Sequence, residues 1–222
     1  MAVAFERYVD GGAGAFLTKA QVSLDGCSPG EYALVLISRE VTDNPTTVPG
    51  GWSLLEKHSD TYAHFLYGKT LAEGDCIALL TWDFAASKKT LTTAAVYSGV
   101  ESADSEKGAF GTGSDTTIDC GSITTSEVMV VALTAMYSTA SRTVGNVADF
   151  TERRERGSTS PDFWHQIGDT DGAWEGGACA PDYTIDSGNS ATYRGGFIVE
   201  LAGEGEPPAA TAFMTPRWPG VW

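Results

Sequence analysis

Apolar and polar side chains alternate along much of the chain with the two-residue period of a β-strand. Residues 2–9 (AVAFERYV) and 61–70 (TYAHFLYGKT) follow this period, so each segment would turn one face to a core and one to solvent. Residues 31–38 (EYALVLIS) and 75–82 (DCIALLTW) are almost continuously apolar, which is typical of strands in the middle of a sheet. The pattern therefore predicts strands of both kinds.

Further strand-like segments, rich in β-branched and aromatic residues, follow along the chain, with turn-forming residues between them. They span residues 15–24, 90–100, 127–137, 161–167 and 191–201. About ten to twelve strands without alternating helices indicate an all-β fold. The sequence therefore predicts a single antiparallel β-sandwich domain over residues 1–202.

The composition changes at Gly203. Residues 203–210 (GEGEPPAA) are predicted to form a Gly/Glu/Pro linker, and residues 211–222 (TAFMTPRWPGVW) an extended, proline-stiffened C-terminal tail. Large aromatic side chains on such a stiff segment favour an anchor that docks on a neighbouring subunit or on a particle. The anchoring residues would be Phe213, Arg217, Trp218 and Trp222. The alternative is that the tail folds back over its own sandwich.

The net charge of the chain limits the classes of partner that it can bind. It carries 14 Lys and Arg against 29 Asp and Glu, a net charge of −15, so it has no excess of cations for binding nucleic acid or anionic lipid. No apolar run has the length of a transmembrane helix, and the N-terminal residues lack the pattern of a signal peptide. We therefore expect no nucleic-acid partner, no membrane insertion and no secretion signal.

The four cysteines are Cys27, Cys76, Cys120 and Cys179, and none of them forms a CxxC pair of the kind that zinc sites use. The expectation is four reduced, mostly buried thiols. Disulfides are the alternative if the protein acts outside the cell that made it.

Residues 26–30 (GCSPG) match the Gly-x-Ser-x-Gly pattern of a hydrolase nucleophile elbow. That site needs a helix after the serine and a backbone N–H on the next residue as an oxyanion donor. Here Pro29 follows Ser28 and has no N–H, and residues 31–38 are predicted as a strand. The segment is interpreted as a hairpin turn, and no catalytic residue is predicted anywhere in the chain.

The histidines and acidic residues show no clear pattern of a metal-binding site. His58, His64 and His165 are expected at the surface or half-buried. Residues 168–172 (GDTDG) form part of a calcium-loop pattern but lack its later ligands, so a solvated turn is predicted. No cofactor is expected; a structural Ca²⁺ held by Asp169 and Asp171 is the alternative.

Two tryptophans are candidates for stacking on sugar rings. Trp164 and Trp174 lie in or beside polar, turn-rich sequence, which favours their exposure. If the protein binds a glycan, these two residues are the predicted site. The −15 charge would repel a polyanionic surface, so a neutral sugar or a Ca²⁺ bridge is favoured.

The order of the segments is also similar to that of a known family. The start MAVAFERYVDGGAG precedes the LDGC…YALVLIS strand, VPGGWSLLEK and HFLYGKTLAEGD. The most specific stretch, residues 77–102, ends one strand in Tyr97-Ser98-Gly99-Val100, and DFTERRERGS and GNSATYRGGFIVELAG match the closing part. Over residues 1–202 the chain resembles the lectin-like, jelly-roll β-sandwich structural domains in virion proteins of tailed phages, prophages and phage-like particles.

This resemblance implies a non-enzymatic structural protein on the virion surface, as head decoration, spike or tail-attached protein. Its partners would be capsid or tail proteins and copies of itself, and it would be made in the host cytoplasm. The first alternative is a glycan-binding host-adhesion module of a tail or fibre. The second is a glycan-cleaving enzyme on the same scaffold, which would need two carboxylates facing each other in a cleft.

Overall fold

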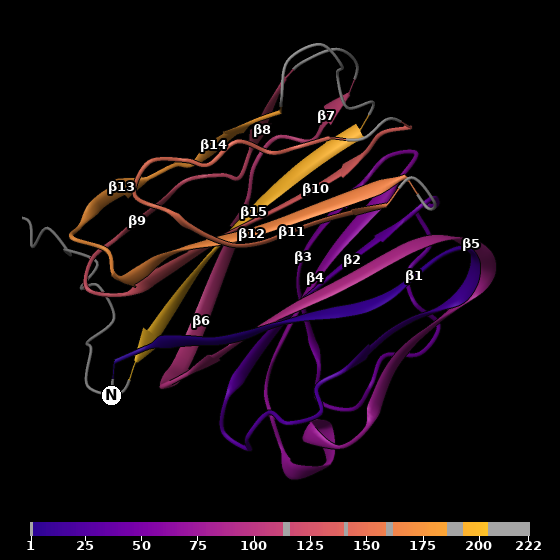
Figure 1. Cartoon of the computed structure of the whole chain (residues 1–222), viewed down its shortest axis with the longest axis horizontal. Helices are drawn as coiled ribbons and strands as arrows, with labels where there is room; N and C mark the ends of the chain where they lie inside the picture. Colours follow the sequence, from indigo (N-terminus) through magenta and orange to yellow (C-terminus); the bar gives the residue numbers. More distant parts are fainter. Residues whose placement is uncertain (1, 113–115, 140–141, 159–161, 186–192, 204–222) are drawn as a thin grey trace, which may run out of the picture.

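The computed structural model describes residues 2–112, 116–139, 142–158, 162–185 and 193–203 (Figure 1). In these residues the chain forms fifteen β-strands and one short 3₁₀ turn. No helix among them has both the length and the apolar character needed to cross a bilayer. All strand pairs are antiparallel, so the predicted all-β sandwich is confirmed. The linker from residue 204 onward and the C-terminal tail lie outside the described residues.

Two main sheets face each other. The first sheet has the order β1–β5–β2–β4–β3 and the second the order β11–β12–β10–β15–β6, with β7 also pairing with β15. The strands of the first sheet are β1 (Ala4–Ser23), β2 (Tyr32–Arg39), β3 (Ser53–Ser59), β4 (Ala63–Thr70) and β5 (Leu79–Ser98). Those of the second are β6 (Val100–Lys107), β7 (Gly111–Thr112), β10 (Met129–Tyr137), β11 (Thr151–Ser158), β12 (Phe163–Ala173) and β15 (Tyr193–Gly203).

Two small strand pairs and the 3₁₀ turn complete the described structure. The pairs are β8 (Thr117–Asp119) with β14 (Asp182–Thr184), and β9 (Ile123–Thr125) with β13 (Gly177–Cys179). The 3₁₀ turn η1 spans Glu73–Cys76. It occupies part of residues 75–82, which the apolar pattern predicted as a strand, so β5 begins only at Leu79.

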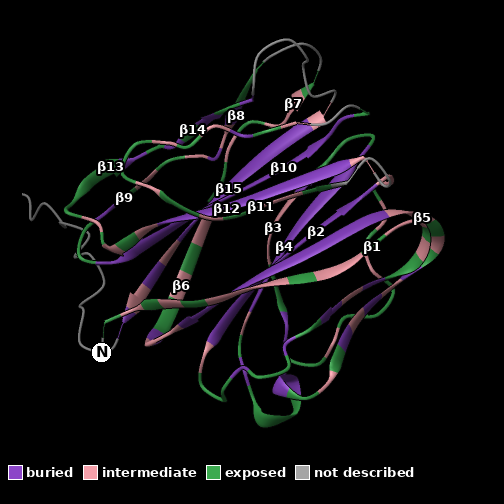
Figure 2. Cartoon of the chain, in the orientation of Figure 1, coloured by how far each residue is buried: buried purple, intermediate pink, exposed green. Residues whose placement is uncertain are grey.

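The strands in the middle of both sheets are buried on both faces, because each sheet is covered on its outer side as well (Figure 2). In β2, Leu34 and Leu36 point into the inter-sheet core, whereas Val35 and Ile37 join an outer cluster that covers the first sheet. In β10, Val131 lies in the inter-sheet core and Val130 in an outer cluster supplied by β8, β13 and β14. Continuous apolar runs follow from this burial.

The outer cover of the first sheet comes from its own longest strands. β1 and β5 pair along nearly their whole length and turn together at the right of Figure 1, which carries their far ends over the outer face. The sequence predicted two separate strands in each of these regions, but each is continuous across bulges. At the fold-back, a Cβ on Gly11 would lie 2.5 Å from the carbonyl oxygen of Gln21, so only glycine fits this approach.

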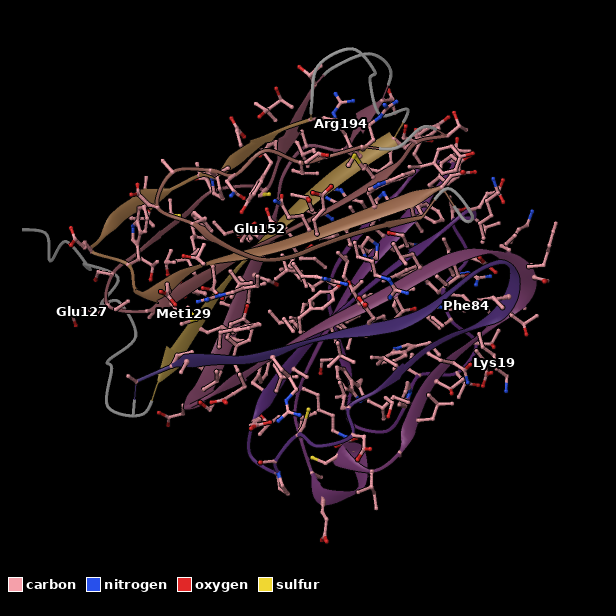
Figure 3. The ribbon with its side chains drawn as sticks, in the orientation of Figure 1. Lys19, Phe84, Glu127, Met129, Glu152 and Arg194 are labelled. Carbon is pink, nitrogen blue, oxygen red and sulfur yellow. The ribbon has the colours of Figure 1, made fainter. Side chains whose placement is uncertain are left out.

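The side chain of Arg39, at the end of β2, bonds to both β1 and β5 where these strands bend. Its guanidinium donates to the carbonyl oxygens of Leu17 and Ala86 and to the hydroxyl of Thr90, at 2.6–3.1 Å. It also lies 3.8 Å from the ring centroid of Phe84. Figure 3 labels Phe84 and Lys19 in this region. A buried cation with several donors in use fixes the curvature of both strands.

The GCSPG segment is a turn but not a hairpin, which corrects that part of the interpretation. β5 lies between β1 and β2, so the segment crosses from one strand to a strand that does not pair with it. The N–H of Cys27 bonds the oxygen of Leu24 at 3.0 Å, and Gly26 and Gly30 have φ of 81° and 91°. The strand β2 follows Ser28, which is the context that excludes a nucleophile elbow.

Candidate functional site

A chain of hydrogen bonds crosses the inter-sheet core. The Ser38 hydroxyl lies 2.7 Å from Nδ1 of His64 and 2.6 Å from Nε2 of His165, and the Thr93 hydroxyl lies 2.9 Å from Nδ1 of His165. Because a hydroxyl has one proton, Ser38 donates to one ring and accepts from the other. The four residues come from β2, β4, β5 and β12, so this inter-sheet hydrogen-bond chain joins the two sheets.

The environment of this chain is closed to solvent. Ser38, His64 and Thr93 have no exposed surface and His165 is 1% exposed. Burial lowers the pKa of His64 to about 3, with the nearby His58 as the second cause, and burial also puts the pKa of His165 well below its ordinary value. A serine between two neutral histidines has the contacts of an activated nucleophile, but all of these side chains are buried. Their hydrogen bonds connect the two sheets.

The prediction that the histidines are exposed or half-buried is therefore wrong for all three. His58 is also buried, and its Nε2 lies 2.9 Å from the carbonyl oxygen of Gly196. Burial lowers its pKa as well.

A buried ion pair in the second sheet also contacts the first sheet. Arg153 on β11 binds both carboxylate oxygens of Asp169 on β12, at 2.7 and 2.8 Å, and it also binds Asp171. The Tyr97 hydroxyl from β5 of the first sheet donates to Asp169 at 3.3 Å, and the guanidinium lies 4.8 Å from the ring centroid of Phe5. The arrangement is a bidentate pair with good geometry.

This pair corrects the interpretation of GDTDG. Residues 168–172 belong to β12 rather than to a solvated turn, and Asp169 is completely buried. Asp169 and Asp171 both bind Arg153, so a cation already occupies the position proposed for Ca²⁺. No group of three or more His, Cys, Asp or Glu side chains suited to a metal occurs among the described residues.

Trp164 does not have the exposure that its sequence context predicted. It is 5% exposed and belongs to the outer cluster of the second sheet. Gly157 lies opposite it on β11, where a Cβ would come 1.8 Å from the indole Nε1. The indole therefore fills a tight space and offers no surface to a sugar.

Trp174 is only half-buried and lines a surface hollow of about 530 Å³, a volume within the range of ligand sites. The residues of this Trp174 hollow are Asp149, Thr170, Ala173, Trp174, Glu175 and Gly176. The sequence pattern indicated Trp174 but neither Asp149 nor Glu175. Glu175 directly follows the tryptophan, whereas Asp149 reaches the hollow from a turn whose position depends on the fold.

The four cysteines are buried free thiols, as predicted. Burial raises the pKa of Cys120 well above its ordinary value, and burial together with the charge of Asp149 raises the pKa of Cys179 to about 11. These thiols therefore remain protonated at neutral pH.

The predicted anchor residues Phe213, Arg217, Trp218 and Trp222 lie outside the described residues.

Comparison with protein-family models, with curated proteins and with solved structures gives no match to the chain.

Proposed function

We propose that this chain is a non-enzymatic structural protein of a bacteriophage or phage-like particle, displayed on the particle surface as head decoration, spike or tail-attached protein. The observation that supports it is the use of the reactive side chains. Ser38, His64 and His165 connect the two sheets, as does the hydrogen bond from Tyr97 to the Asp169 of the Arg153–Asp169 pair. These groups make a rigid sandwich, which suits a protein that must remain folded on a particle exposed to its surroundings.

Contacts along both sides of the sandwich support the same role. Arg154 on β11 pairs with Asp10 on β1 at 3.2 Å, and Lys107 on β6 pairs with Glu56 on β3 at 3.6 Å. Each pair joins the edge of one sheet to the edge of the other. Charged, bridged edges oppose strand-to-strand aggregation where many copies are crowded together.

The direct test is the composition of particles. Particles purified by density gradient from a host that encodes the chain should contain it, and quantitative mass spectrometry should give its copy number relative to the major capsid protein. Hundreds of copies would indicate head decoration, and a handful would indicate a tail or vertex position. Particles that consistently lack the chain would contradict the proposal.

Removal of the tail should separate folding from assembly. A chain that ends at Gly203 keeps every strand of both sheets, so we expect an unchanged circular dichroism spectrum and thermal unfolding transition. We expect this chain to be lost from particles, because the aromatic tail is the proposed anchor. The matched full-length variant replaces Phe213, Trp218 and Trp222 with alanine and should show the same loss. Full occupancy of both variants would exclude the tail as the anchor.

A second candidate function is glycan binding for adhesion to a host, and the Trp174 hollow favours it. A partly exposed indole beside two acidic side chains can offer an apolar surface to a sugar ring and acceptors to its polar groups. The two functions are compatible, because a displayed protein can also bind a host.

A further inference from the structure

We propose that the Trp174 hollow binds a protonated amino sugar, with the apolar face of the sugar on the indole and its ammonium group at Asp149 and Glu175. This proposal rests on the glycan-binding candidate function and specifies its ligand class. It follows from three properties of the hollow: the atoms that the indole exposes, the state of the two carboxylates and the rigidity of the surrounding backbone.

The exposed part of Trp174 is hydrocarbon. Its Nε1 is buried and has no hydrogen-bond partner, so the accessible atoms of this half-buried side chain are ring carbons. One part of the ring packs against the outer cluster of the second sheet, which fixes its position. A fixed carbon surface next to polar groups suits the C–H face of a pyranose, which is apolar, whereas the edge of the sugar is polar.

The two carboxylates beside the ring are free to take up a cation. Asp149 and Glu175 are exposed, and neither forms a hydrogen bond or an ion pair in the described part of the chain. By contrast, Asp169 and Asp171 on the neighbouring part of β12 are already paired with Arg153. A charge-assisted bond to an ammonium group is stronger than one to a neutral hydroxyl, so these acids favour an amino sugar over a neutral one.

The charge of the whole chain acts in the same direction. A net charge of −15 repels glycans that carry carboxylate, sulfate or phosphate groups and attracts those that carry an ammonium group. An ammonium group near the indole also gains from the negative potential of the ring face.

The backbone around the hollow is fixed before any ligand arrives. The N–H of Trp174 donates to the oxygen of Val128 at 2.7 Å, and its own oxygen accepts from the N–H of Glu127 at 2.9 Å. Figure 3 labels Glu127 and Met129, which mark the start of β10 at this end of the molecule. Thr170 accepts a bond from the N–H of Val130 at 3.1 Å. Such pre-organisation lowers the entropic cost of binding.

The test is a comparison of two oligosaccharides that differ only in the amine. The purified full-length protein is titrated at mildly acidic pH with a glucosamine trimer and with the N-acetylglucosamine trimer, followed by calorimetry and tryptophan fluorescence. We expect the glucosamine trimer to bind at least about ten-fold more tightly, because acetylation removes the charge. Equal affinities, or binding of neither trimer, would overturn the proposal. Choline is the third probe. If choline binds as tightly as the glucosamine trimer, the hollow recognises a cation and not a sugar, which contradicts the proposal.

Variants locate the site. Asp149→Asn with Glu175→Gln removes both charges at exposed positions and should weaken glucosamine binding about ten-fold or more. The matched control, Asp25→Asn with Glu101→Gln, makes the same charge change at exposed positions outside the hollow and should bind as the parent does. Trp174→Phe keeps an aromatic ring and should retain part of the affinity, whereas Trp174→Ala should lose it. If the Asp149→Asn, Glu175→Gln variant binds glucosamine as tightly as the control variant does, the hollow is not the binding site.

These results are independent of the particle assay. If the chain is present in particles but binds no amino sugar, the result supports the structural role and contradicts the amino-sugar proposal. If the chain binds the glucosamine trimer through the hollow but is absent from particles, the result supports the amino-sugar proposal and contradicts the virion role.

Discussion

The substitution Arg153→Met is expected to lower the free energy of unfolding by about 3–5 kcal/mol, because it leaves a buried carboxylate without its cation. Asp169 is completely buried, and Arg153 supplies both of its charge-assisted bonds. The remaining donors, the Tyr97 hydroxyl and the N–H of Asp171, are neutral. Urea unfolding followed by tryptophan fluorescence would measure the change.

The neighbouring Arg154 is the control for this experiment. Its side chain is 51% exposed and pairs with Asp10, so Arg154→Met should cost less than about 1 kcal/mol. The double variant Arg153→Met with Asp169→Leu should recover part of the loss, because no unpaired charge is then buried. A similar small effect at both arginines would show that the buried pair is not what stabilises this part of the sandwich.

Acidification is expected to destabilise the protein before most carboxylates are protonated. Burial holds the pKa of His64 at about 3 and the pKa values of His58 and His165 below their ordinary range, whereas an unfolded chain has a histidine pKa of about 6.5. Between these values the unfolded chain binds more protons than the folded one. Stability is therefore complete above about pH 6.5 and falls as the pH decreases, by up to about 1.4 kcal/mol per pH unit for each histidine.

The variant His165→Gln isolates one of these protons. Glutamine keeps hydrogen-bonding groups near Ser38 and Thr93 but does not titrate, so the slope of unfolding free energy against pH should decrease by up to about 1.4 kcal/mol per pH unit below about pH 6.5. Carboxylates titrate in both proteins, and the difference between the two slopes removes their contribution. Identical slopes would contradict the burial of a neutral His165.

The central strands could be predicted from sequence because their environment affects every residue. β2 is apolar at consecutive positions, which only a strand covered on both faces requires. The sequence also contains an indication of the inter-sheet hydrogen-bond chain. Ser38 and His165 stand in phase with the core residues Leu36 and Ile167 on their strands. A polar residue at a core position predicts a buried partner, although not which one.

The remaining features depend on register, which no local pattern contains. GDTDG has the composition of a turn, and only the pairing of β11 with β12 brings Arg153 beside Asp169. The exposure of Trp164 was predicted wrongly because its polar neighbours suggested a surface, whereas the fold places the indole beside Gly157. Asp149 likewise reaches Trp174 only when the turn before β11 is in place.

The pairing of β1 with β5 has a consequence for how the protein folds. Ala4 pairs with Ser98 and Ser23 with Leu79, so β1 cannot find its partner β5 until β2, β3 and β4 have also been made. Contacts between such distant residues slow folding, because a long loop must close before they form. During that time β1 has unpaired backbone groups on both sides. The protein is therefore expected to fold slowly, and newly made chains are most vulnerable to aggregation before β5 is complete.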